Sequence, residues 1–201
     1  DLDLSRMAVV DNIDMVQNVC TNYSSIKNIV FDESFKTYAP TSLSGFFGGC
    51  ETLETISGLE YLNTANVEIM DNMFNGCSAL TSLDLTNFNT AKVTDMSYMF
   101  MGCSALTTIY ASDEFVTTKV EIGSDMFSGC TKLKGFDSSM IDHKKANCGT
   151  DGYFTPGCAY AEFDNATLTF RYKGVKPAEA YDLNVESNNP GWEAQKGNIK
   201  K

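Results

Sequence analysis

Apolar residues recur through the middle of the chain with the period of a repeated structural unit. Glycine-cysteine pairs end at Cys50, Cys77, Cys103 and Cys130, in steps of 27, 26 and 27 residues. Four apolar positions precede each cysteine; in the second unit they are Val67, Met70, Met73 and Phe74. Their spacing places the side chains on one face of a helical turn. We therefore expect each unit to begin with a short helical or 3₁₀ segment.

A strand pattern follows each cysteine. Leucine stands three residues after it and a large apolar residue stands six after it; the second unit reads Leu80-Thr-Ser-Leu83-Asp-Leu85. Alternation of apolar and polar residues around 83–85 is typical of a strand with one face inward. A unit of this length with an L-x-x-L-x-L strand indicates a leucine-rich-repeat solenoid, in which each coil buries its apolar face against its neighbours.

The flanks predict a different organisation. Apolar residues spaced by three from Met7 to Val19 predict a helix after Ser5, and hence a helical cap over residues 1–25. The coils would occupy residues 26–141. Residues 142–201 would form an extension with a β-hairpin, its strands at 160–163 and 168–172 around the turn 164–167. Residues 197–201 echo 25–28, which predicts that a further block of coils begins there.

The recurring cysteines have three interpretations: metal ligands, reactive thiols or one buried core position. None of the four has another cysteine or histidine two to four residues away, and His143 is the only histidine, so neither zinc nor a thiol-base pair is favoured. We expect no metal and no cofactor. The predicted core ladder consists of Cys50, Cys77, Cys103, Cys130, Phe74, Phe100 and Phe127.

The cysteine count also bears on cross-linking. Seven cysteines are an odd number, so at least one thiol is left over. Cys148 and Cys158 flank a short loop, and the sequence leaves open whether they form a disulfide or stay unpaired.

The composition of the chain limits the classes of partner that it can bind. The 201 residues carry 26 acidic and 15 basic side chains, a formal net charge of −11, which repels nucleic acid and anionic lipid. No apolar run approaches the roughly 18 residues that a transmembrane helix requires. We expect neither nucleic-acid binding nor a transmembrane segment in this chain.

The segment MFNGCSALTSLDLTNFNTAKVTDMSYMF, residues 73–100, resembles the BspA-like leucine-rich repeats of bacterial surface proteins, including the variant built on a 26-residue unit. The likeness covers residues 40–141. It implies an α/β repeat fold: a leucine-rich-repeat-like right-handed solenoid with short helical turns and one strand per coil, plus the C-terminal β-hairpin extension. It also implies a secreted or outer-surface adhesin without enzymatic activity.

Candidate binding residues come from the outward positions of the strands, which stacking would align into columns. These positions include Ser82, Asp84, Thr108, Tyr110 and Asp137. Tyr110 is the one aromatic residue there; it suits stacking on a sugar or a protein contact, and equally an ordinary strand tyrosine. Asp84 and Asp137 suit a cation or a basic partner, or simply keep the sheet soluble.

The sequence therefore predicts non-catalytic binding at the cell surface or outside the cell, to a host protein, a matrix component or a glycan. The alternative is a structural spacer in a longer surface protein. No nucleophile-base pair, paired-acid motif or phosphate-binding loop is visible, so we expect no enzyme activity.

Overall fold

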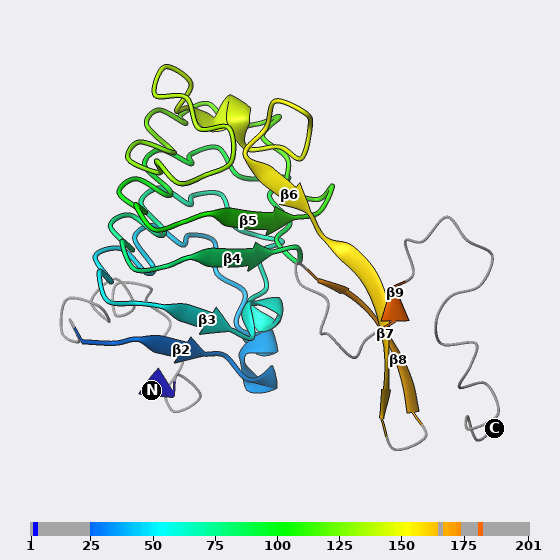
Figure 1. Cartoon of the computed structure of the whole chain (residues 1–201). Helices are drawn as coiled ribbons and strands as arrows, with labels where there is room; N and C mark the ends of the chain where they lie inside the picture. The colour runs from blue at the N-terminus through cyan, green and yellow to red at the C-terminus, as the bar shows by residue number, and fades with distance from the viewer. Residues whose placement is uncertain (1, 4–24, 165–166, 174–180, 183–201) are drawn as a thin grey trace.

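The computed structural model describes residues 2–3, 25–164, 167–173 and 181–182, and within them nine strands form three sheets (Figure 1). The first sheet is parallel and contains β1 (Leu2–Asp3), β2 (Asn28–Val30) and β3 (Thr55–Ser57). The second is parallel and contains β4 (Ser82–Leu85), β5 (Thr108–Ala111) and β6 (Phe154–Pro156). The third is antiparallel and contains β7 (Cys158–Asp164), β8 (Thr167–Lys173) and β9 (Tyr181–Asp182).

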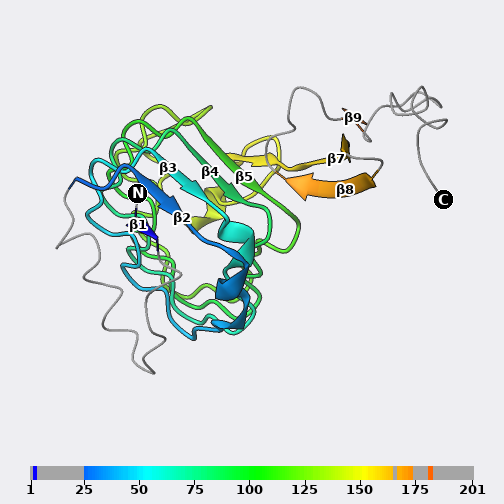
Figure 2. The same cartoon turned by 90° about the horizontal axis from the view of Figure 1, so that it is seen from below.

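Successive coils lie side by side, as Figures 1 and 2 show from two directions. The strand expected in the second unit is present as β4, and Leu83 pairs with Ile109 of β5, one coil later. A second line of parallel bridges joins four coils through Ser42, Ile69, Asp95 and Ile122. The second and third coils are thus joined at two places, whereas β3 and β4 belong to different sheets and only the bridge between Ser42 and Ile69 joins their coils in this pattern.

The segments expected to be helical are runs of turns. Within the described residues there is no α-helix, and the three 3₁₀ helices lie elsewhere: η3 (Glu33–Thr37), η4 (Leu59–Tyr61) and η5 (His143–Lys145). The Phe46 N–H donates to the carbonyl of Leu43, three residues back, but the Phe47 N–H donates to Met73 in the next coil. Because an α-helix needs its N–H groups for bonds inside the segment, this alternation excludes one. Turns and helices share the three-residue apolar spacing, which is why the pattern alone did not separate them.

A stack of phenylalanine rings runs through the core. Phe47, Phe74, Phe100 and Phe127 lie nearly parallel, with centroids 5.1, 5.5 and 5.5 Å apart from one ring to the next. All four rings are buried. The same side chain therefore occupies the same place in each coil, at a spacing that suits ring stacking.

The cysteines form a second column beside the rings. Cys50, Cys77, Cys103 and Cys130 are all buried. Cys50 is disulfide-bonded, which departs from the expected ladder of free thiols, whereas the other three are free. Each free thiol donates to a phenylalanine carbonyl of the preceding coil: Cys77 to Phe47 (3.2 Å), Cys103 to Phe74 (3.1 Å) and Cys130 to Phe100 (3.0 Å).

The fourth coil departs from the prediction because its strand is missing. Residues 135–139 form turns, with Gly135 in the left-handed region at φ 72°. The place beside β5 is taken by β6, which pairs Thr155 with Tyr110. The sheet therefore includes residues 154–156, which the sequence analysis assigned to the extension beyond residue 141.

Aromatic side chains close the C-terminal end of the ring stack. The Tyr153 ring packs edge-on against Phe127 at 5.1 Å, and Phe154 packs edge-on against Phe115 at 4.9 Å. The fourth coil has Gly123 where the second and third coils have Met70 and Met96, and a Cβ there would collide with the His143 ring. Residues 141–154 thus cover the apolar end that an open stack would expose.

The predicted hairpin is confirmed, with Asp164 paired to Thr167 across its turn. β9 adds a third strand that the sequence analysis did not predict, and the hairpin extends beyond the edge of the coils in Figures 1 and 2. The predicted N-terminal helix and the echo at 197–201 lie outside the described residues. In the part of the chain that the structure describes, no helix has the length and apolar character needed to cross a membrane.

Candidate functional site

The outward side of β4, β5 and β6 carries a short array of polar side chains. The strand register places Ser82 beside Thr108, and Asp84 beside Tyr110. Thr155 of β6 continues the second line because it is paired with Tyr110. We call Asp84, Tyr110 and Thr155 the sheet-face row. Four of the five predicted binding residues thus lie together on one face, as the alternation predicted.

The Asp84 carboxylate is already engaged. Its Oδ1 accepts hydrogen bonds from the backbone N–H of Thr86 (3.1 Å) and from the Thr86 hydroxyl (2.6 Å). The side chain is half-buried. Asp84 therefore presents a fixed acceptor at one end of the row, beside the half-buried ring of Tyr110.

Asp137 does not join the row, contrary to the prediction. It lies in the turn that replaces the fourth strand, where its carboxylate accepts from the N–H (2.8 Å) and the hydroxyl (2.7 Å) of Ser139. These two bonds, with a smaller contribution from the charge of Lys145, hold the pKa of Asp137 below its usual value. Its backbone N–H donates to the hydroxyl of Tyr153. Asp137 lies outside the row because the fourth coil lacks the strand that would have aligned it with the others.

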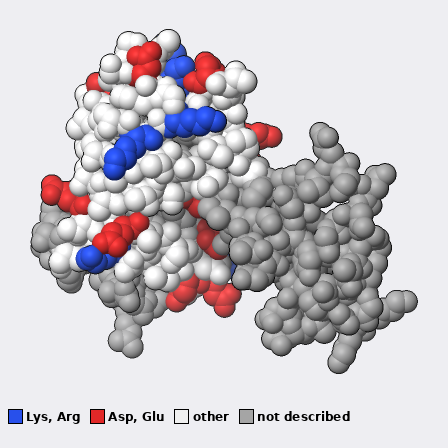
Figure 3. Space-filling model, viewed as in Figure 1, with Lys and Arg blue, Asp and Glu red and all other residues white. Residues whose placement is uncertain are grey.

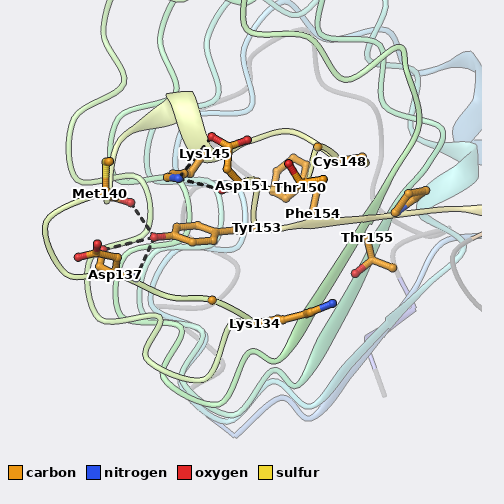
Figure 4. A pocket seen from close by; sticks show the side chains of 14 residues that line it. Lys134, Asp137, Met140, Lys145, Cys148, Thr150, Asp151, Tyr153, Phe154 and Thr155 are labelled. Atoms are coloured by element: carbon orange, nitrogen blue, oxygen red, sulfur yellow. Dashed lines mark hydrogen bonds and ion pairs between the residues drawn. The ribbon is translucent and has the colours of Figure 1, made fainter.

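A pocket of about 420 Å³ lies between this turn and the loop before β6 (Figure 4). Lys145 donates to the carbonyl of Asp151 at 2.8 Å and lies 3.6 Å from its carboxylate. Lys134 lies across the pocket from this pair. Thr155 also lines the pocket, so the pocket adjoins the sheet-face row. The residues of this pocket all lie within 134–156, where the repeat pattern ends, so no periodicity indicated that they fold around a hollow.

The thiols are poor candidates for chemistry. Burial raises the pKa of Cys77 to about 12 and also raises the pKa of Cys148. The pKa of Cys103 is raised by its contact with Cys130 and by burial. Among the described residues no three histidine, cysteine or acidic side chains are grouped to hold a metal ion. Cys148 is a free thiol, so the structure contains no Cys148–Cys158 disulfide.

Charge is spread over the face that carries the strands. Figure 3 shows acidic and basic side chains standing singly or in small groups on a largely uncharged surface. Three of the four ion pairs among the described residues have both side chains exposed, such as Lys27 with Glu54 at 2.7 Å, and exposed pairs contribute little to stability. Uncharged residues therefore dominate this surface.

Two residues of the candidate site, Thr155 and Tyr153, were not predicted from the sequence. Thr155 completes the sheet-face row, and Tyr153 anchors the turn that holds Asp137. Both follow residue 141, where the repeat pattern has ended. The alternation of Tyr153, Phe154 and Thr155 was the available signal, but a run this short does not identify its partner strand.

Comparison with known proteins identifies a family. A family model described as "Mycoplasma protein of unknown function, DUF285" matches residues 13–143. No curated protein and no solved structure matches. The matched segment contains β2 to β5 and ends within η5.

Proposed function

This chain belongs to the DUF285 family, whose description assigns no function, and we propose that it is a non-catalytic binding module of a secreted or cell-surface bacterial protein. Its ligand would be a host protein, a matrix component or a glycan, held on the outward side of β4 to β6. The resemblance of residues 73–100 to BspA-like repeats supports this role.

The proposal includes a fold assignment. We infer that the coils form a right-handed solenoid of the leucine-rich-repeat kind, with turns in place of helices. Parallel pairing between coils, the phenylalanine stack and the cysteine column support the assignment. The handedness follows from the general rule for crossovers between parallel strands. Such folds present long, regular surfaces to partners.

The sheet-face row carries the functional proposal. Asp84, Tyr110 and Thr155 come from three strands and share one face because of the strand register. An aromatic ring between a fixed carboxylate and a hydroxyl offers both stacking and hydrogen bonding. A non-catalytic role agrees with thiols whose raised pKa values keep them protonated at neutral pH.

The test is binding of the purified domain, with its thiols kept reduced, to a panel of matrix proteins and glycans. Tyr110→Ala is the test variant, and Tyr98→Ala, which removes an exposed ring elsewhere, is its control. We expect saturable binding that Tyr110→Ala weakens about tenfold, the loss of one good contact, and that Tyr98→Ala leaves unchanged. Equal binding by both variants would contradict a role for the row.

A structural spacer is the second candidate, from a different class. The echo of residues 25–28 at 197–201 favours it, because it suggests that blocks of coils alternate with hairpins. Absence of binding across the panel would support the spacer and argue against the binding proposal.

A further inference from the structure

A groove crosses the coils just beyond the carboxyl ends of β3, β4 and β5. One hollow of about 460 Å³ and a second of about 420 Å³ both include Asn87 and Glu114 in their walls, so they adjoin. The first also contains Tyr61, Asn63 and Asn89, and the second Ser112 and Asp113. We call the two together the strand-end groove. It spans three coils, about 10 Å at the usual strand spacing.

Side-chain amides line this groove with oriented donors. Asn63 and Asn89 occupy equivalent places one coil apart, and each uses its amide oxygen to accept the N–H of an alanine two residues on, at 3.1 Å. This bond fixes the amide and leaves its NH₂ group to donate. In the described part of the chain, neither these NH₂ groups nor the exposed Asn87 side chain has a partner.

Residues that can accept hydrogen bonds also line the groove. Glu114, whose side chain is exposed, lines both hollows, and Tyr61 lines the first. A sugar hydroxyl both donates and accepts, so a surface that interleaves amide donors with carboxylate acceptors can satisfy successive hydroxyls. A ligand with only one kind of group would leave the other kind desolvated and unpaired, which is costly.

The charge of the groove limits which sugars it can bind. Glu60, Asp113 and Glu114 outnumber Lys36, the one cation among the groove's described residues. Lys36 is also occupied, lying 3.9 Å from the Glu33 carboxylate and over the Tyr61 ring at 5.1 Å. With a chain net charge of −11 as well, the groove repels phosphate, sulfate and carboxylate groups. A basic peptide would satisfy the acids but would leave the amide donors unpaired.

We propose that the strand-end groove binds a neutral oligosaccharide, with the amides of Asn63, Asn87 and Asn89 donating to its hydroxyls and Glu114 accepting from them. The site goes beyond the proposed sheet-face function, because its residues follow the strands and are separate from the sheet-face row. The two surfaces adjoin where Asp84 bonds to Thr86, which also lines the groove.

The experiment titrates the full chain with neutral hexose and N-acetylhexosamine oligosaccharides, each beside its sulfated counterpart, by isothermal calorimetry. At least one neutral oligosaccharide should bind, and its sulfated counterpart should bind at least about tenfold more weakly. Asn87→Ala should weaken binding about tenfold, because it removes one amide that donates to the sugar and no other group replaces that hydrogen bond. The matched control is Asn66→Ala, which removes an exposed amide that bonds to Lys92 outside the groove.

The outcomes separate this proposal from its rivals. If Tyr110→Ala abolishes sugar binding while Asn87→Ala leaves it unchanged, the sugar lies on the sheet-face row; the groove is then excluded and the proposed function stands. If no neutral oligosaccharide binds but a lysine-rich peptide does, with affinity lost in salt and in Glu114→Gln, the groove is a basic-peptide site and the proposal fails. Sugar binding that survives Glu114→Gln supports the proposal, because the amide oxygen still accepts.

Discussion

At the scale of single residues, one backbone conformation recurs at the same place in successive coils. Gly45, Asn72, Tyr98 and Asp125 all adopt the left-handed region, with φ between 55° and 60°. Glycine, asparagine and aspartate tolerate this region, whereas a residue such as tyrosine is strained there. Three of the four residues could therefore have been predicted from their type. Tyr98 could not, because only the coil geometry imposes its conformation.

The strain at Tyr98 gives a prediction. Tyr98→Gly and Tyr98→Ala both remove the ring, but only glycine relieves the left-handed penalty. We expect the glycine variant to be more stable than the alanine variant by about 1 kcal/mol in urea unfolding. Equal stability would contradict the left-handed assignment, since glycine at an ordinary φ is the less stable of the two.

At the scale of elements, the alternation of apolar and polar residues correctly predicted a strand. Leu83 and Leu85 alternate with outward residues, and β4 lies where they indicated. The turns were indistinguishable from helices because Phe46 bonds locally while Phe47 bonds to the next coil. β6 was missed because its partner, β5, lies more than 40 residues earlier in the chain. Long-range pairing of this kind leaves no periodic trace in the sequence.

The C-terminal turn depends on the hydroxyl of Tyr153. The hydroxyl accepts from the N–H of Asp137 and donates to the carbonyl of Met140, both at 2.9 Å, and the side chain is buried. Tyr153→Phe should lower the free energy of unfolding by about 1 kcal/mol, because it removes the partner of the Asp137 N–H and of the Met140 carbonyl in a partly buried position.

The matched control is Tyr110→Phe, because the hydroxyl of Tyr110 has no hydrogen bond among the described residues. It should change stability by less than about 0.5 kcal/mol. Equal losses from the two substitutions would show that the turn does not rely on the Tyr153 hydroxyl.

At the scale of the whole molecule, one continuous core runs through all the described coils. The ring stack and the thiol column pass from coil to coil, so the coils should unfold together. The sequence predicted this core well, since its period fixes which side chains meet. It did not predict the aromatic residues that close the C-terminal end, because they interrupt the repeat.

The buried thiols make stability depend on pH in alkaline solution. The pKa of Cys77 rises from 9.0 to about 12 on folding, so the unfolded chain loses this proton first. The thiol's contribution is therefore complete below pH 9 and is lost as pH rises from 9 toward 12. Urea unfolding across this range should show falling stability. The Cys77→Ala variant should show a shallower fall, because lysine and tyrosine titration is common to both proteins; an unchanged slope would contradict a buried thiol.

The central claim is that the recurring cysteine marks one buried position in a recurring coil. The most direct test is alkylation of the native protein with N-ethylmaleimide, located residue by residue by mass spectrometry. Cys77, Cys103 and Cys130 should stay unlabelled until denaturant is added, while the half-buried Cys148 reacts first. Rapid labelling of Cys77 or Cys103 in the native protein would contradict the stacked core and the alignment of the outward residues that depends on it.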